Sequence, residues 1–423
     1  MAKVIKRRWV SEVGSGLPRK GRRSCDYEAY LPDLLVDREV VLDGRVAADV
    51  SEAEAALARF SLEVGALADS EALVRLLLRT ESVASSRIEG LEIGARRLLH
   101  ADAERKLGEP ARDVTAADVL GNIDAMLFAI ESIGEGDRLS VDLLLETHRR
   151  LLLGTRLEAH GGQLRDEQNW IGGSSFNPCS AEYVPPPPEA VPDLIADLCE
   201  FCNDEALPAV AQAAIAHAQF ETIHPFVDGN GRVGRALIHL VMRRRGVVSR
   251  VLPPVSLILA TWAQEYVAAL TGTRYRGAAS SRLAQEGLDR SVGLFATATT
   301  RAVAAAAAFE ERVELLELTW RRRLGRVRAD SAADLLLRRL PGAPILTVQS
   351  AADLIGRSTQ ATNQAIAHLV DAGVLSQTTV GRRNRAFEAP EVLRAFTALE
   401  RQLASPSGDT RTASPTRRVP RRN

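Results

Sequence analysis

The sequence has little of several residue classes, and each shortage excludes a class of protein. Only 4% of its 423 residues are aromatic, and 54 lysines and arginines balance 54 aspartates and glutamates. A chain without net charge has no global field that attracts nucleic acid or an anionic membrane. The basic start MAKVIKRRWV is not followed by an apolar segment, so we predict no signal peptide. Apolar runs such as RAVAAAAAFEERVELLEL are interrupted by charge, so we expect no membrane partner and a cytoplasmic location.

Cysteine is also scarce. The four cysteines are too few and too scattered for a disulfide framework. Cys199 and Cys202 form a C-x-x-C pair, but the surrounding DLIADLCEFCNDEAL predicts a helix, and no second ligand pair completes a zinc site. We therefore predict packed thiols at these two positions.

Helical patterns dominate what the sequence does contain. Alanine, leucine and arginine are abundant and favour helix, and apolar residues recur every three or four positions from residue 51 to about 328. The length of 423 residues suggests two or three domains. We predict a mainly α-helical protein.

Residues 161–191 break the helical pattern. Their sequence, GGQLRDEQNWIGGSSFNPCSAEYVPPPPEAV, is rich in glycine and proline, with short extended stretches at 169–171 and 183–184. This pattern is typical of a hairpin or an ordered loop. Because structureless loops of this length are uncommon in compact domains, we expect a loop with a function.

The stretch IHPFVDGNGRVGR, residues 223–235, follows two predicted helices and starts a third. The glycines of 229–231 allow positive φ and close approach of the backbone to a ligand. A helix that begins there offers free N–H groups and partial positive charge, which bind phosphate. Arg232 and Arg235 lie three residues apart and share a helix face. Two guanidinium groups at a helix start are suited to a polyphosphate.

Two further side chains complete the predicted chemistry. Asp228 is a hard oxygen ligand suited to Mg²⁺ that bridges phosphates. His224 can take a proton from an attacking hydroxyl. The other common phosphate signature, G-x-x-x-x-G-K-[ST], is absent from the sequence. A solvated glycine-rich turn is the alternative interpretation, and the ordered histidine, acid and arginines argue against it.

HPFVDGNGRVGR resembles the signature of the Fic family, H-x-F-x-[DE]-G-N-G-R-x-x-R, at every defined position. The segments YLPDLL, SSRIEG and WIGGSS also resemble parts of Fic proteins. The resemblance implies a helical Fic core with a β-hairpin flap, and transfer of AMP from ATP to a Ser, Thr or Tyr hydroxyl of a protein.

The resemblance also implies roles for the residues of the motif. It makes His224 the general base and Asp228 the Mg²⁺ ligand. The implied nucleotide-binding residues are Gly229, Asn230, Gly231, Arg232 and Arg235, with Asn230 on the transferred phosphate and the arginines on the distal phosphates. Phe226 is expected to be a core anchor.

The resemblance also assigns a flap and an inhibitory segment. The flap, with Trp170, Ile171, Gly172 and Gly173, is expected to bind an unknown target protein by β-augmentation. SSRIEG matches the inhibitory pattern [ST]-x-x-x-E-[GN] through Ser85 and Glu89, four residues apart on a predicted helix. In the family that glutamate pairs with the second arginine of the motif, here Arg235, and occupies the place of the γ-phosphate. The protein should therefore be autoinhibited.

Near the C-terminus, SAADLIGRS and TQATNQAIAHLVDAGVL predict two helices, and SQTTVGRRNRAFEAP predicts two short strands around Gly381. This order resembles a winged helix-turn-helix. Arg382, Arg383 and Arg385 on its wing are candidates for contacts with DNA phosphates. A solvated turn, or a unit that docks proteins or forms a homodimer, is the alternative.

We expect five segments along the chain. Residues 1–112 contain the inhibitory helix, 113–265 the Fic core, 266–328 a helical extension, 329–398 the winged helix-like domain, and 399–423 a disordered tail. Two alternatives to AMP transfer from ATP stay open at the same site, namely another nucleotide donor and removal of AMP. A DNA-binding regulator is an alternative of a different class.

Overall fold

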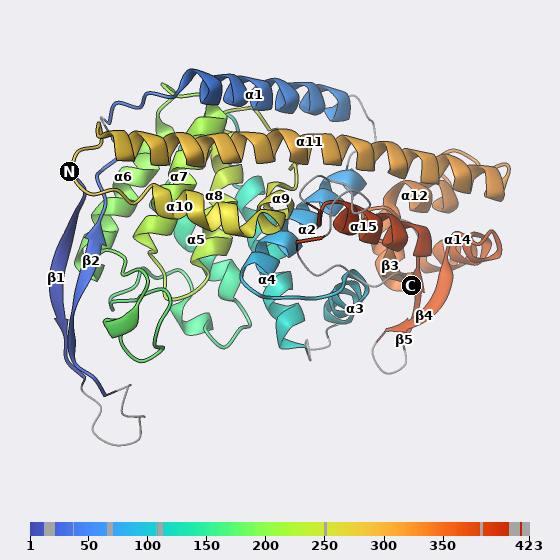
Figure 1. Cartoon of the computed structure of the whole chain (residues 1–423). Coiled ribbons are helices and arrows are strands. Elements are labelled where there is room, and N and C mark those ends of the chain that lie inside the picture. The colour runs from blue at the N-terminus through green and yellow to red at the C-terminus, as the bar shows by residue number, and fades with distance from the viewer. Residues whose placement is uncertain are drawn as a thin grey trace. The chain divides into compact units, whose positions relative to one another are not determined.

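The computed structural model describes residues 1–11, 22–36, 38–65, 71–106, 108, 113–248, 252–380, 384–405 and 415–416. They are mainly helical, as predicted, and form two compact units (Figure 1). The first unit draws on residues 1–54, 128–247 and 264–297, and the second on residues 55–127, 248–263 and 298–423. The five consecutive segments expected from the sequence stay a prediction.

The first unit combines a two-stranded antiparallel sheet with helices. In the sheet, Lys3 of β1 lies opposite Leu31 of β2, and Trp9 lies opposite Cys25. The elements of this unit are β1 (Lys3–Trp9), β2 (Cys25–Leu31), α5 (Val141–Leu152), η1 (Glu158–His160), η2 (Pro178–Ser180), η3 (Pro188–Ala190), α6 (Val191–Asn203), α7 (Ala209–Ile223) and α8 (Asn230–Arg244), most of α10 (Ala263–Gly272), and parts of α1 (Gly44–Gly65), α4 (Val114–Glu131) and α11 (Arg282–Leu324). The helix predicted from Ser51 thus begins earlier, at Gly44.

Helix α7 is buried along its whole length, because alanines and other apolar residues occupy every side of it. Helix α8 packs closely against it at Gly234, where an added Cβ would lie 2.7 Å from Glu221 Oε1 and 3.2 Å from His217 Nδ1. On the α10 side, the hydroxyl of Tyr266 lies 2.6 Å from His217 Nε2. The helix that follows the motif is therefore fixed against the buried centre of the unit.

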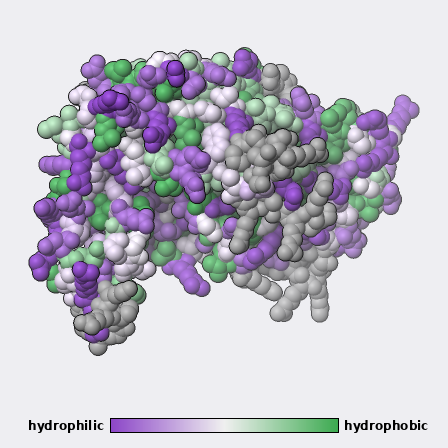
Figure 2. Space-filling view, viewed as in Figure 1, coloured by the Kyte–Doolittle hydropathy of each residue, from purple (hydrophilic) through white to green (hydrophobic). Residues whose placement is uncertain are grey.

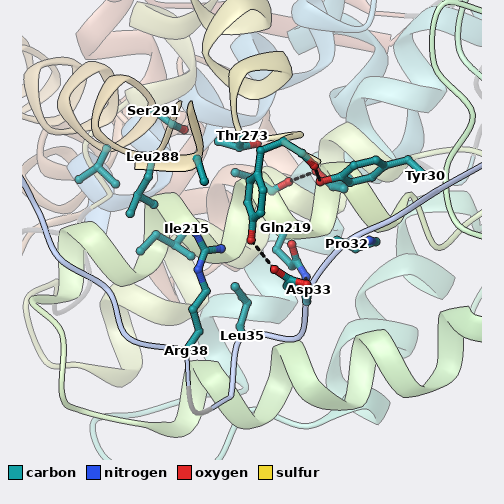
Figure 3. Close-up of a pocket in the computed structure, with 15 residues that line it drawn as sticks. Tyr30, Pro32, Asp33, Leu35, Arg38, Ile215, Gln219, Thr273, Leu288 and Ser291 are labelled. Carbon is teal, nitrogen blue, oxygen red and sulfur yellow. Dashed lines mark hydrogen bonds between the residues drawn. The ribbon is translucent and has the colours of Figure 1, made fainter. Parts of the chain in front are cut away.

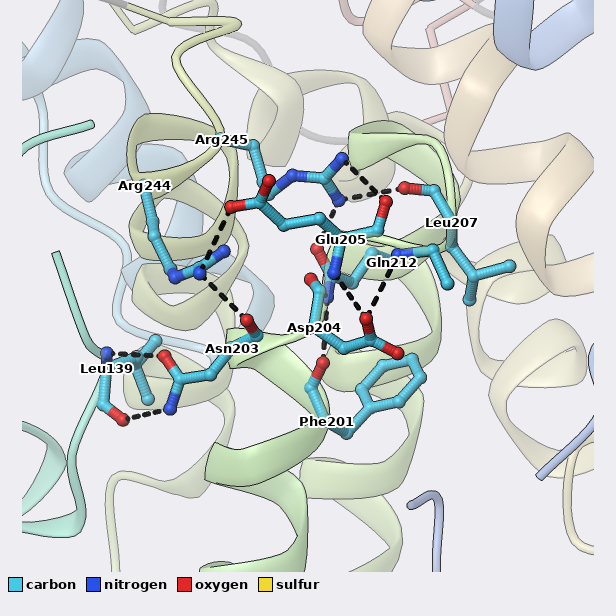
Figure 4. Close-up of polar contacts among 10 residues, drawn as sticks. Leu139, Phe201, Asn203, Asp204, Glu205, Leu207, Gln212, Arg244 and Arg245 are labelled. Carbon is cyan, nitrogen blue, oxygen red and sulfur yellow. Dashed lines mark hydrogen bonds and ion pairs between the residues drawn. The ribbon is translucent and has the colours of Figure 1, made fainter. Parts of the chain in front are cut away.

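The C-terminal end of α8 is tied to the turn between α6 and α7 (Figure 4). Arg244 donates to the carbonyl of Asn203 at 2.8 Å and pairs with Glu205 at 3.3 Å. Arg245 donates to Gln212 Oε1 at 2.8 Å. These contacts hold the far end of the helix whose first turn carries the motif.

The two cysteines of α6 match the prediction of packed thiols. Cys199 and Cys202 are free, buried thiols. Burial raises the pKa of Cys199 to about 12 and raises that of Cys202 as well. Both thiols therefore stay protonated at neutral pH and act as small packed groups.

The second unit packs helices against a three-stranded antiparallel sheet with the order β3-β5-β4. Trp320, Leu336, Leu369 and Phe387 are among its buried core residues. Its elements are α2 (Glu71–Ile88), α3 (Ala95–Lys106), α9 (Val255–Thr261), α12 (Ala332–Arg339), β3 (Ile345–Thr347), α13 (Val348–Ile355), α14 (Thr359–Asp371), β4 (Ser376–Val380), β5 (Asn384–Glu388) and α15 (Pro390–Gln402), with the remainder of α1, α4 and α11.

The helices and strands predicted near the C-terminus are present as α13, α14, β4 and β5. Gly381, Arg382 and Arg383 lie outside the described residues. Arg385 is exposed and donates to Asn363 on α14 at 2.7 Å. The assignment as a winged helix stays a prediction. Helix α15 extends to Gln402, past the boundary expected at 398, because Val392, Phe396 and Leu399 bury one face of it.

Helix α11 is long and apolar enough to cross a membrane by length and composition, and half of its most apolar window is buried. This is weak support for a membrane span, since a core helix has the same properties. Figure 2 shows hydrophilic and hydrophobic residues interspersed over the described part of the viewed face. The absence of a membrane partner stays a prediction.

Candidate active site

His224 ends helix α7 in an uncommon conformation. It is the C-cap residue, with φ of 50° and ψ of 60°, and its N–H donates to the Phe220 carbonyl at 2.9 Å. Left-handed backbone is rare for residues with a side chain and persists only where neighbouring groups hold it. The predicted catalytic base thus lies on a constrained loop of the motif.

Phe226 and Asn230 close this loop. The N–H of Phe226 donates to Asn230 Oδ1 at 2.8 Å, and Asn230 Nδ2 donates to the Phe226 carbonyl at 2.8 Å. Phe226 is buried, which confirms the predicted core anchor. Both ends of the Asn230 amide therefore bind Phe226 and shape the loop, and its contact with the transferred phosphate stays a prediction.

His148 on α5 packs against the motif loop. Its ring stacks on Phe226 with centroids 3.7 Å apart, Nε2 lies 3.1 Å from the Asp228 carbonyl, and Nδ1 accepts the Gly162 N–H at 3.1 Å. The accepting Nδ1 makes Nε2–H the donor to Asp228. Burial lowers the pKa of His148 to about 4, so the ring is neutral at neutral pH. These contacts make His148 a structural residue of the motif loop.

Gly229 is the N-cap of α8 and requires glycine. Its φ is 79°, and an added Cβ would lie 2.7 Å from Leu151 Cδ2. No side chain caps this end of the helix. The N–H groups of the first turn, which includes Asn230 and Gly231, therefore have no side-chain acceptor from the N-cap residue. Free N–H groups and the helix dipole make this end suited to an anion.

Arg232 and Arg235 both lie on α8 and are buried, at 5% and 1% exposure. Arg232 Nη2 donates to Asp228 Oδ2 at 2.8 Å. Its Nε and Nη1 are buried without a hydrogen-bond partner among the described residues. A buried cation with two unused donors is costly unless an anion completes its hydrogen bonds. Arg232 therefore fits a phosphate ligand.

Asp228 is the carboxylate predicted to bind a metal ion. Its side chain is 48% exposed, so it is open to solvent on one side while Arg232 contacts the other. Within the described part of the chain, no group of three or more His, Cys, Asp or Glu residues could hold a metal ion. A carboxylate beside a phosphate site nevertheless fits Mg²⁺, which usually takes one or two carboxylates and completes its shell with phosphate oxygens and water.

The predicted flap has less sheet than expected. Ile171 and Tyr183 form an isolated antiparallel bridge, with the Ile171 N–H donating to the Tyr183 carbonyl at 2.8 Å. The described residues between them form no further strand, and η2 occupies part of the loop. Ile171, Gly172 and Gly173 are exposed, and both glycines have positive φ. The β-hairpin is therefore one bridge with an exposed tip.

A disulfide and an aromatic contact attach the flap to the N-terminal sheet. Cys25 of β2 is bonded to Cys179 of η2, 154 residues later. Trp170 packs edge-on against Trp9, with ring centroids 5.3 Å apart. The four scattered cysteines gave no framework from which this single crosslink could be predicted. Residues so distant in sequence give no pairing signal before the fold brings them together.

Ser85 and Glu89 lie at the end of α2. Ser85 is buried on the helix, whereas Glu89 is exposed and follows the last helical residue, Ile88. The Leu91 N–H donates to the Ser86 carbonyl at 3.0 Å across Gly90, whose φ is 81°. This arrangement ends the helix in a Schellman motif. It turns the chain at Gly90 and places Glu89 just beyond the regular helix.

Helix α2 is held within its unit by buried polar side chains. The Glu81 carboxylate accepts the Ser256 N–H at 2.8 Å at the start of α9. Arg87 pairs with Glu400 of α15 at 2.8 Å, with side-chain exposures of 12% and 3%. Asn122 of α4 donates to Ser86 Oγ at 3.0 Å.

A small pocket lies elsewhere in the first unit (Figure 3). The Tyr275 hydroxyl donates to Asp33 at 2.6 Å, Gln219 Nε2 donates to the Asp33 carbonyl at 2.8 Å, and the Tyr30 hydroxyl donates to the Tyr275 carbonyl at 2.7 Å. Figure 3 shows Arg38 among the lining side chains. None of the predicted site residues lines this pocket.

Comparisons with known proteins agree with the geometry. Residues 138–242 match the Fic/DOC family, and residues 47–131 match the Fic/DOC family N-terminal region. A protein adenylyltransferase fic-1 of Caenorhabditis elegans is 38% identical over 135 residues, which is 31% of this chain and 24% of that protein. A probable protein adenylyltransferase of Aquifex aeolicus is 41% identical over 70 residues, 16% of this chain and 22% of that protein.

The chain thus spans about a quarter of the length of these curated relatives. A solved Fic family protein from Desulfovibrio desulfuricans has the same fold, with a TM-score of 0.51 and 20% identity. That match covers 83% of this chain and 97% of the other. It bears on the fold alone.

Proposed function

We propose that the chain transfers AMP from ATP to a hydroxyl group of a protein, and the match of residues 138–242 to the Fic/DOC family supports this proposal. The observation that carries the proposal is Arg232, a buried guanidinium whose Nε and Nη1 have no hydrogen-bond partner among the described residues. It lies beside an α8 terminus that no side chain caps. This combination suits the phosphates of a nucleotide. The relatives named protein adenylyltransferase support the same activity.

The reaction needs a base, a phosphate site and a leaving group. His224 takes the proton of the target hydroxyl, whose oxygen forms a bond to the α-phosphorus. The bond from that phosphorus to the oxygen bridging the α- and β-phosphates breaks, and pyrophosphate leaves. Arg232 and Arg235 bind the distal phosphates, and N–H groups of the 229–231 turn bind the transferred one. Catalysis of this kind depends mainly on positioning and on stabilisation of charge.

A divalent cation is part of the proposal. Mg²⁺ neutralises phosphate charge when it is bound. The Asp228 carboxylate, half-exposed beside Arg232, is the protein ligand we propose for it. Because the described residues offer no larger cluster of metal ligands, binding of the metal should depend on the nucleotide.

We propose that Glu89 restrains the enzyme by pairing with Arg235. An Arg–carboxylate pair is charge-assisted and often bidentate, so it competes well with a phosphate for the same guanidinium. Ser85 and Glu89 carry the inhibitory pattern at the end of α2, and the Schellman motif after Ile88 fixes the direction in which the chain leaves the helix.

Target binding is assigned to the exposed flap tip at Ile171, Gly172 and Gly173. Pairing of the main chain with an extended segment would fix the position of the hydroxyl with little demand on side-chain identity. Trp170, held by its indole N–H to the Ser174 carbonyl at 2.7 Å, anchors this tip.

The test is intact-mass analysis after incubation with Mg²⁺ and ATP. We expect little or no added AMP on the wild type, clear addition on Glu89→Gly, and none on Glu89→Gly/His224→Ala. Parallel reactions with UTP, GTP and CTP report the donor, and incubation of a purified AMP-modified sample reports removal. Labelling that survives His224→Ala would overturn the catalytic assignment. Equal labelling of wild type and Glu89→Gly would overturn the restraint while leaving the transferase intact.

A further inference from the structure

Arg165 lies in the stem of the flap and reaches the motif loop. Its side chain is buried at 3% exposure. Nε donates to the His224 carbonyl at 2.9 Å, and Nη2 lies 3.4 Å from the Ile223 carbonyl. Its own backbone N–H donates to the Pro225 carbonyl at 2.9 Å. One residue therefore contacts three consecutive carbonyl groups around the proposed base.

The same guanidinium also joins the two stems of the flap. Nη1 donates to the Glu167 carbonyl at 3.1 Å, before the flap, and Nη2 donates to the Pro186 carbonyl at 2.5 Å, after it. The exposed tip around Ile171 lies between these two stems in the sequence. Movement of either stem relative to the loop would break a hydrogen bond to Arg165.

The charge of Arg165 is unusual for a packing residue. Its side-chain hydrogen bonds all go to backbone carbonyls in the described part of the structure, and it has no carboxylate partner there. Burial lowers the pKa of Arg165 to about 10. A buried cation of this kind is costly, and a well-packed apolar side chain is often at least as stable. What the guanidinium adds is a planar set of donors that fixes several carbonyls at once.

Asn169, also in the flap stem, reinforces the contact. Its Nδ2 lies 3.3 Å from the His224 carbonyl and 3.1 Å from the Phe226 carbonyl. The His224 carbonyl thus accepts from two flap-stem side chains. These contacts hold His224 in its left-handed backbone conformation, with φ of 50°.

We propose that Arg165 is a positioning residue that holds the target-docking flap and His224 in one fixed relation. The inference rests on the proposed transferase function and deepens it. A hydroxyl presented by the flap then meets the base at a set distance, although Arg165 contacts neither the hydroxyl nor the imidazole. A misplacement of about 1 Å can cost about a hundredfold in rate.

Lysine cannot replace this residue. Its ammonium places its donors on one atom, whereas the acceptors of Arg165 lie on both the loop and the flap stems. Arg165→Lys should therefore keep the charge and lose the coupling.

The experiment measures AMP incorporation at varied ATP in the Glu89→Gly background. We expect Arg165→Lys and Arg165→Ala to lower kcat about a hundredfold while KM for ATP changes less than about threefold. Asn169→Ala should lower kcat less, by about tenfold, and it removes no buried charge. Millimolar guanidinium ion should partly restore kcat of Arg165→Ala. The matched control is Arg244→Ala, a buried arginine at the far end of α8 that donates to the Asn203 carbonyl (Figure 4).

Arg244→Ala should lose thermal stability, keep kcat at temperatures where it is folded, and show no response to guanidinium. Unchanged kcat in folded Arg165→Lys and Asn169→Ala would overturn the positioning role. So would an equal loss in kcat for Arg244→Ala, or a rise in KM for ATP that accounts for the whole effect. If the Glu89→Gly parent incorporates no AMP, the proposed function itself fails, which is a separate and visible outcome.

Discussion

The motif loop of the first unit and helix α2 of the second are fixed by different kinds of polar contact. Around the loop, Arg165, Asn169 and His148 donate to backbone carbonyls. Helix α2 also has contacts to backbone groups, such as Glu81 with the Ser256 N–H, but its Arg87 forms a mostly buried side-chain pair with Glu400 of α15. A hydrogen bond to a backbone carbonyl can persist when the side chain of the accepting residue is substituted. A side-chain pair is lost when either partner changes, so the Arg87–Glu400 contact should be easier to break than a contact to a backbone carbonyl.

The largest effect on stability should come from breaking the Arg87–Glu400 pair. Glu400→Ala leaves a mostly buried guanidinium unpaired, and we expect the free energy of unfolding to fall by about 3–5 kcal/mol. Urea denaturation measures this. The matched control is Glu200→Ala, which breaks the Arg138–Glu200 pair. Both of these side chains are exposed, at 71% for Arg138 and 58% for Glu200, so the loss should cost at most about 1 kcal/mol. Equal losses of unfolding free energy in the two variants would show that burial of the Arg87–Glu400 pair does not set its contribution to stability.

Two glycines with similar backbone angles should respond differently to alanine. Gly229→Ala meets both positive φ and Leu151, whereas Gly90 has open space around it. We expect Gly229→Ala to cost about 2–4 kcal/mol, from overpacking added to backbone strain. Gly90→Ala should cost about 1–2 kcal/mol, from backbone strain alone. Thermal melts of both variants test this, and a Gly90→Ala loss equal to that of Gly229→Ala would contradict the crowding inferred at the loop.

A pH dependence of stability is expected at His148. Its folded pKa of about 4 lies below the ordinary 6.5, so the unfolded chain binds more protons between these values. Stability from this group is complete above pH 6.5 and is lost as the pH falls toward 4. His148→Gln should reduce the slope of unfolding free energy against pH by up to about 1.4 kcal/mol per pH unit in that window. Denaturation midpoints across the window measure the slope, and an unchanged slope would show that the ring does not titrate as inferred.

The sequence predicts the parts of the site that are local. The positions of His224, Gly229, Arg232 and Arg235 follow from one continuous stretch, and the structure puts Gly229 at the start of a helix and both arginines on it. Phe226 is likewise the buried anchor expected of it.

The residues that hold the site in place could not be predicted, because their contacts form only in the folded chain. Arg165 is one arginine among many in the sequence, and only the fold brings it to carbonyls 59 residues later. His148 has no sequence neighbour that marks its stacking on Phe226. The Cys25–Cys179 bond joins residues 154 positions apart. The contacts by which the Asn230 amide closes the loop on Phe226 likewise have no signal in the sequence.

The most direct test of the account uses ATP labelled in one phosphate at a time with the Glu89→Gly variant. Label in the α-phosphate should become covalently attached to protein, in a manner that His224→Ala abolishes, and label in the γ-phosphate should not. Attachment of the γ-label, or of neither label, would contradict AMP transfer at this site.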